Sequence, residues 1–161
     1  MSVTPMSVTL MLASGSITLA LVLYTIGVFA ERASRSLRPI HVVMFWCGLA
    51  FDSTGTALMT QMARQGEAGI SPVHGITGAL AIALMLFHAV WALVTLLRHD
   101  ERALEGFHRF SSLVWLAWLA PYLIGLLMGI PMLALPPAAA AILSLAVVLA
   151  LWRTLLRDSK A

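Results

Sequence analysis

Charge is scarce in this sequence. Only 11% of the 161 residues are Asp, Glu, Lys or Arg, whereas 60% are hydrophobic. A soluble domain carries about 25% charged residues, so this composition excludes a soluble globular protein and predicts a chain that lipid covers. The net charge of +3 does not indicate nucleic-acid binding, because the basic residues lie in short loops between apolar runs rather than on one face.

Cysteine is almost absent as well. Cys47 is the only one, and it lies inside an apolar run. A single cysteine excludes an intrachain disulfide and any cysteine-cluster metal site. The sequence also contains no catalytic triad, phosphate-binding loop or nucleotide motif.

Long apolar runs dominate instead. Five of them meet or approach the about 20 residues that a helix needs to cross a bilayer. They predict an all-α integral membrane bundle in one domain, 1–161, with transmembrane helices at about 7–30, 40–62, 72–97, 110–130 and 136–156. The first run is interpreted as a retained helix rather than a secretion signal, because no basic residue precedes it.

The basic residues predict the orientation of these helices. Nine of the ten lie in the first loop, the third loop and the C-terminal tail, which share one side of a five-helix chain, and only Arg64 lies on the other side. The positive-inside rule makes the first side cytoplasmic. We therefore expect an outside N-terminus and a cytoplasmic C-terminus in a bacterial inner membrane.

Two histidines on the third predicted helix form the most suggestive pattern. His74 and His88 are fourteen residues apart, which places both within roughly 40° of one helix face and about 21 Å apart along it. Gly78 and Met85 lie between them on that face, where small side chains let a flat ligand approach closely. Imidazole is a usual axial ligand of haem, so this spacing suggests one or two b-type haems. A structural or interfacial role for each histidine is the alternative.

A second pattern begins just before the fourth predicted helix and continues into it. One helical stripe carries polar and aromatic residues and should face protein rather than lipid: His108, Ser112, Trp115, Leu119 and Tyr122. Trp115 and Tyr122 would wall a planar cofactor. Arg109 would either pair with a haem propionate or extend to lipid phosphate.

Asp52 is the one acid expected inside a span, about midway along the second helix. An acid at that depth orients a histidine, relays a proton, or stays neutral and hydrogen-bonded. Hydroxyl groups of the first helix are the partners predicted for the last case, namely Ser14, Ser16 and Thr18. His41, at the start of the second helix, is either an interfacial residue or a haem ligand.

Several of these strings resemble the small bacterial haem-sensing membrane protein family (HsmA-like), over about residues 10–133. They are FDSTGT at 51–56, His74 with Gly78, LM at 84–85 with His88, and FHRFS at 107–111 leading to Trp115 and Tyr122. The resemblance implies haem binding in the membrane, haem-responsive expression and protection against haem toxicity and oxidative stress. It makes the histidines at the matching positions candidate ligands: His74, His88 and His108.

The sequence thus predicts a membrane protein that holds b-type haem for sequestration or for protection against haem and oxidative stress. His88 is the first expected iron ligand, and the further candidates are His74, His108 and His41. The alternatives are a haem-dependent oxidoreductase that takes electrons from quinol, a non-haem small-molecule carrier, and an accessory subunit. Expected partners are haem, the lipid bilayer and a quinone or other redox partner; a homo-oligomer is open, and no nucleic acid is expected.

Overall fold

The computed structural model describes residues 8–65, 72–130, 132–133 and 135–158. Within those residues the chain forms helices and no strands. The helices are α1 (Val8–Ser34), α2 (Pro39–Arg64), α3 (Pro72–Arg98), α4 (Glu101–Gly129) and α5 (Pro137–Asp158). All five are long and apolar enough to cross a membrane, which confirms the expected fold class.

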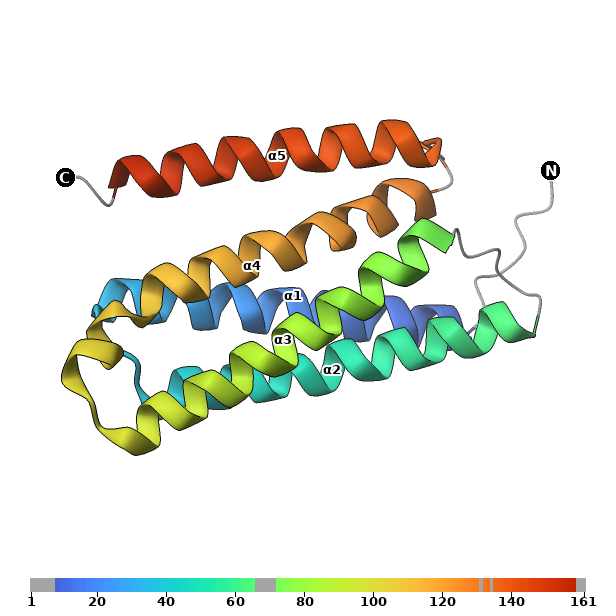
Figure 1. The fold of residues 1–161 in the computed structure, drawn as a ribbon. Coiled ribbons are helices and arrows are strands. Elements are labelled where there is room, and N and C mark those ends of the chain that lie inside the picture. Colours follow the sequence, from blue (N-terminus) through green and yellow to red (C-terminus); the bar gives the residue numbers. More distant parts are fainter. Residues whose placement is uncertain (1–7, 66–71, 131, 134, 159–161) are drawn as a thin grey trace.

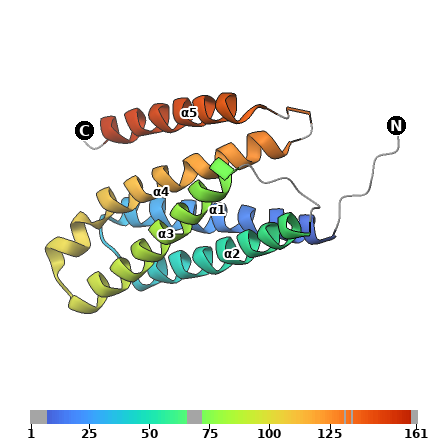
Figure 2. The same ribbon diagram turned by 45° about the vertical axis from the view of Figure 1, so that its right-hand side comes forward.

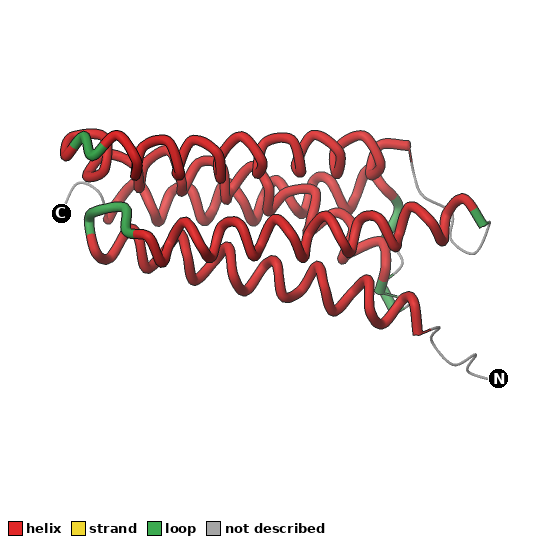
Figure 3. Tube along the Cα trace, turned by 90° about the horizontal axis from the view of Figure 1, so that it is seen from below, coloured by secondary structure: helices red, strands yellow, loops and turns green. Residues whose placement is uncertain are grey.

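The first four helices pack together and α5 lies outside them. Figures 1 and 2 show α1 to α4 running side by side in alternating directions, with α5 against the outer side of α4. Figure 3 shows the connections gathered at the two ends of the helices. The guanidinium of Arg32 ties α5 to the bundle by donating to the Leu155 carbonyl at 2.8 Å.

One end of the bundle collects most of the positive charge. The C-terminal ends of α1, α3 and α5 meet the N-terminal ends of α2 and α4 there, and the Leu37 amide donates to the Leu104 carbonyl at 3.1 Å across that end. We call it the basic end, because it holds a set of arginines: Arg32, Arg35, Arg38, Arg98, Arg102, Arg109 and Arg153.

Capping residues, rather than the limits of the apolar runs, set where the helices begin and end. Asp100 accepts hydrogen bonds from the Arg102 and Ala103 amides, so α4 begins at Glu101 and not near residue 110 as expected. In the same way α1 continues to Ser34 instead of ending near residue 30, so Arg32 lies in its last turn and not in a loop. Pro39 and Pro72 begin α2 and α3 as expected.

Glycines allow α1 and α2 to approach closely. A Cβ added to Gly27 would lie 2.8 Å from the Phe45 ring, and one added to Gly48 would lie 2.5 Å from the Tyr24 ring. Each ring therefore packs directly on the backbone of the facing helix. Tyr24 and Phe45 are both fully buried by this arrangement.

Large apolar side chains cover the outside of the molecule. Exposed examples come from every helix: Leu12, Val43, Leu80, Leu113 and Ile142. Hydrocarbon solvates such a surface and water does not. The polar side chains that are buried inside the bundle are therefore the unusual ones, and they define the candidate site.

Candidate functional site

From Ala81 onward, one face of α3 points into the bundle. Ala81, Met85, His88 and Ala92 are buried and recur every three or four residues. His74 occupies the next register position of this stripe; it lies in α3, but its side chain is outside the part that the structure describes. Gly78 lies between, and no described atom comes within 4 Å of a Cβ added there.

His88 is fully enclosed by protein. Its ring lies between the rings of Phe45 on α2 and of Phe107 and Phe110 on α4, with centroid distances of 4.4, 5.5 and 5.8 Å. Its Nε2 lies 3.1 Å from the Ser111 Oγ of α4. Three helices thus position this imidazole, and aromatic rings exclude water from it.

The hydrogen bond with Ser111 leaves one nitrogen of His88 available. Nδ1 is buried and has no hydrogen-bond partner among the described residues. If Nε2 donates to Ser111, Nδ1 carries a lone pair and no proton, which is the state in which imidazole binds a metal. The alternative tautomer would leave a buried N–H unpaired, which costs about 1–3 kcal/mol.

Glu31 is a buried residue that the sequence analysis missed. It is fully buried in the last turn of α1, and neither carboxyl oxygen has a hydrogen-bond partner in the described structure. The Ser111 side chain faces this carboxyl, although Ser111 forms its hydrogen bond with His88. Glu31, Ser111 and His88 therefore form one buried polar cluster, which we call the His88 cluster.

A helical stripe in the sequence could have revealed Glu31. Ala20, Tyr24 and Val28 are buried on the face of α1 that Glu31 continues, at spacings of four, four and three residues. The expected end of the helix near residue 30 instead assigned Glu31 to a charged loop.

His41 and His108 differ in whether their hydrogen bonds leave a ring nitrogen with a lone pair available to a metal. The Nδ1 of His41 accepts a hydrogen bond from the Arg38 amide at 3.1 Å and caps α2, so its neutral ring carries the proton on Nε2. The Nδ1 of His108 lies 2.8 Å from the Glu105 carbonyl. A carbonyl only accepts, so Nδ1 of His108 donates and Nε2 keeps a lone pair, as in most metal-binding histidines.

Asp52 has a partner on a different helix from the one expected. Its Oδ2 accepts a hydrogen bond from Nε1 of Trp118 on α4 at 2.8 Å. The hydroxyls of Ser14 and Thr18, which one of the alternatives offered as partners of this acid, donate instead to carbonyls four residues earlier in α1. Serine and threonine inside helices commonly make such local bonds.

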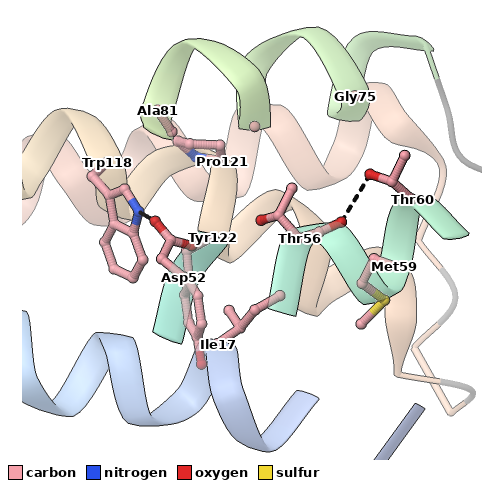
Figure 4. Close-up of a pocket in the computed structure, with 11 residues that line it drawn as sticks. Ile17, Asp52, Thr56, Met59, Thr60, Gly75, Ala81, Trp118, Pro121 and Tyr122 are labelled. Atoms are coloured by element: carbon pink, nitrogen blue, oxygen red, sulfur yellow. Dashed lines mark hydrogen bonds between the residues drawn. The ribbon is translucent and has the colours of Figure 1, made fainter. Parts of the chain in front are cut away.

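A small cavity adjoins Asp52, in the half of the bundle away from the basic end. Its volume is about 110 Å³, and all four bundle helices line it: Ile17, Asp52, Thr56, Met59, Thr60, Gly75, Gly78, Ala81, Trp118, Pro121 and Tyr122. Figure 4 shows the hydrogen bond between Asp52 and Trp118 beside it.

Trp115 and Tyr122 lie in different surroundings. Trp115 packs on α1, where its Nε1 donates to Thr25 Oγ1 at 3.2 Å and its ring meets Phe29 at 5.3 Å. Tyr122 stacks on Trp118 at 5.5 Å and lines the cavity. Arg109 is exposed on the first turns of α4. His99 is exposed in the turn after α3.

Comparison with known proteins identifies the class of this bundle. A family model described as eukaryotic cytochrome b561 matches residues 6–128, which span α1 to α4 almost completely. The chain belongs to the cytochrome b561 family. This is a haem-binding membrane family, so b-type haem is the cofactor and the expected membrane cytochrome class is confirmed. Comparisons with curated proteins and with solved structures find no match.

The donor groups of the His88 cluster fit a haem of this family. The buried, unpaired Nδ1 of His88 is the kind of atom that an iron ion would satisfy. The rings of Phe45, Phe107 and Phe110 fill the space around it, so these side chains must move when a macrocycle binds. The nitrogen that would bind iron is therefore in place. Space for the haem ring requires the three phenylalanine side chains around His88 to shift.

Proposed function

We propose that this protein is a b-type membrane cytochrome that transfers electrons across the bilayer, and that His88 is the principal ligand of its haem. The family match supports the cofactor and the type of reaction. The observation that carries the choice of His88 is its complete burial with one unpaired ring nitrogen between α2, α3 and α4. Bound haem would supply a one-electron carrier at this depth.

His108 is our proposed second ligand, ahead of His41. The hydrogen bond from Nδ1 of His108 to the Glu105 carbonyl already leaves Nε2 free to bind a metal. His41 would first have to give up the hydrogen bond with which it caps α2, a cap being worth about 1 kcal/mol. His74 holds the remaining histidine position of the α3 stripe, and we keep it as the ligand that a second haem would use.

Ser111 and the surrounding aromatic residues position the proposed ligand. When Nε2 of His88 donates to the hydroxyl of Ser111, this hydrogen bond selects the tautomer with a free Nδ1. The rings of Phe45 and Phe107 hold the imidazole plane from two sides and keep water out. Glu31 places a carboxyl next to Ser111, where it would influence the electrostatic potential at the haem.

The narrower parts of the proposal rest on the sequence. The likeness to the HsmA-like family supports haem sequestration and protection against haem and oxidative stress as the physiological use of this chemistry. The concentration of arginines at the basic end supports a cytoplasmic location for that end, with the N-terminus outside and a bacterial inner membrane as the host. We treat residues 1–161 as one domain.

Absorption spectroscopy of the purified protein tests the haem assignment. Protein from haem-replete cells should show a Soret band and a reduced α band, and an alkaline pyridine extract should contain b-type haem. His88→Ala should lose most of the haem, whereas His99→Asn, an exposed histidine in the α3–α4 turn, should retain it. A normal spectrum in His88→Ala would move the site elsewhere, and an absence of haem in the unmodified protein would refute the proposal.

A further inference from the structure

The cavity beside Asp52 is separate from the His88 cluster, and none of Glu31, Ser111 and His88 lines it. It lies between the halves of α1 to α4 that are remote from the basic end, and α5 contributes nothing to it. The four helices that form it are those covered by the family match. A space that all four of these helices line is a natural place for a ligand.

Asp52 supplies the hydrogen-bonding chemistry of this cavity. It is the one acid among the described lining residues, and it is 5% exposed. Trp118 fixes Oδ2 by a 2.8 Å hydrogen bond, and the Trp118 ring is itself held edge-on by Tyr24 at 4.9 Å. The carboxyl is thus held in one orientation and keeps acceptor capacity for a hydroxyl of a ligand in the cavity.

The shape of the cavity suits a flat ring. Gly75, Gly78 and Ala81 give α3 a floor with almost no side chains, and a Cβ on Gly78 would meet no described atom within 4 Å. Trp118 and Tyr122 form the opposite wall, with their planes 25° apart. Small residues facing aromatic rings are the arrangement that admits a planar group.

The volume of the cavity sets the size of the group that enters it without movement of its walls. The cavity measures about 110 Å³ and is partly open, whereas a closed apolar cavity of about 150 Å³ holds one benzene molecule. A single six-membered ring with one edge at the opening fits this space.

We propose that this cavity binds the ring of a neutral, lipid-soluble hydroquinone that donates electrons to the haem, with one ring hydroxyl donating a hydrogen bond to Asp52. The proposal rests on the function proposed above. A hydroquinone combines the three required properties: one ring, a hydroxyl donor, and solubility in the bilayer that surrounds these helices. Apolar lining groups such as Ile17 and Met59 favour the neutral ring over an anionic reductant.

The reaction balances with Asp52 as the proton acceptor. In the first step an O–H bond of the hydroquinone would break, its proton would go to the Asp52 carboxylate, and a haem held by His88 would accept the one electron. Asp52 would then release the proton through the open side of the cavity, and the electron would leave by the proposed transfer across the bilayer. A second identical step removes the other proton and electron from the ring and leaves a quinone.

Stopped-flow reduction of the purified holoprotein tests this proposal. Unsubstituted hydroquinone (benzene-1,4-diol) should reduce the haem of the unmodified protein with saturation kinetics. Asp52→Asn keeps the size of the side chain and an oxygen acceptor for Trp118, but it cannot accept the proton. Because general-base catalysis is worth about 10²–10⁴-fold, this variant should slow the reaction by about that factor, with haem content and reduction by dithionite unchanged.

A second variant tests the space rather than the acid. Gly78→Leu should fill the cavity, because the added atoms point into open space, and should raise the hydroquinone concentration needed for half-maximal rate about tenfold or more. Gly15→Leu is the matched control, since a side chain there also meets no described atom within 4 Å and Gly15 does not line the cavity.

The outcomes separate this inference from the proposed function. An absence of haem refutes the function itself. Haem that dithionite reduces but the hydroquinone does not, or wild-type kinetics in both Asp52→Asn and Gly78→Leu, overturns the cavity assignment alone. Ascorbate provides the remaining comparison: if it, and not the hydroquinone, depends on Asp52, the ligand is an anionic reductant and the proposal is wrong.

Discussion

Replacing Gly48 by alanine tests whether α1 and α2 approach each other as closely as the structure shows. The new Cβ would lie 2.5 Å from Cε1 and 2.6 Å from Cδ1 of Tyr24, far inside van der Waals contact. Tyr24 is fully buried and packs edge-on against Trp118 at 4.9 Å, so its ring has no free space to move into. The helices must therefore separate or the ring must shift into Trp118.

The expected size of the effect follows from two opposing contributions. Overpacking a filled interior costs about 1–3 kcal/mol, and a contact this short at a fully buried ring belongs in the upper part of that range. Alanine in place of glycine favours the helix by about 1 kcal/mol. The net destabilisation should be about 1–2 kcal/mol, which corresponds to a fall in Tm of roughly 2–8 °C for a chain of this size.

Thermal unfolding of the detergent-solubilised protein measures this difference. Gly15→Ala is the matched control, because a Cβ at that position meets no described atom within 4 Å, and it should leave Tm unchanged or raise it by up to about 4 °C. The double variant Gly48→Ala/Tyr24→Leu should lose less than the sum of its single changes, since the smaller side chain removes the clash. If Gly48→Ala unfolds at or above the temperature of Gly15→Ala, the close packing of α1 on α2 is wrong.

Three further predictions concern the buried polar groups and the orientation. Trp118→Phe removes the indole N–H that donates to Asp52 and should cost about 1.5–3 kcal/mol. Trp115→Phe should cost less, about 0.5–1.5 kcal/mol, because its bond to a threonine hydroxyl is neutral; equal losses in thermal unfolding would contradict this. Glu31→Met replaces a buried acid that lacks hydrogen bonds and should raise the stability by about 1 kcal/mol or more, so a fall in Tm would show that Glu31 has a partner after all. A fluorescent protein fused to the C-terminus in bacterial cells should fold and fluoresce in the cytoplasm, and a dark fusion that is periplasmic by protease access would reverse the orientation.

Several features of the candidate site follow from the sequence because lipid is the solvent. A bilayer requires about 20 apolar residues in each span, so composition and run length were enough to predict five helices. Any polar group that faces lipid is costly, so the spacing of His88, Met85 and Ala81 was enough to predict one inward face of α3, and these residues are buried together. The haem cofactor followed from the histidines and from the resemblance, and the family match confirms it.

Contacts between helices depended on the tertiary structure. The partner of Asp52 is Trp118 rather than a hydroxyl of α1, because the rotation of each helix about its axis decides which neighbour a side chain faces. The sequence holds both tryptophans and hydroxyls at suitable depths and cannot choose between them. The same rotation brings Tyr122 to the cavity and takes Trp115 to α1.

By itself, then, the sequence determined that the chain forms five membrane-spanning helices and that histidines of these helices face the interior of the bundle. Run length and helical period decide both points, and each is a property of a single segment. Only the tertiary structure decided that Glu31 is buried, that Ser111 bonds to His88 and faces Glu31, and that His41 caps a helix while His108 keeps a nitrogen free. Those facts depend on the residue at which each helix begins or ends and on which atoms of neighbouring helices come into contact. Neither is encoded in the pattern of one segment, so both required the packed bundle.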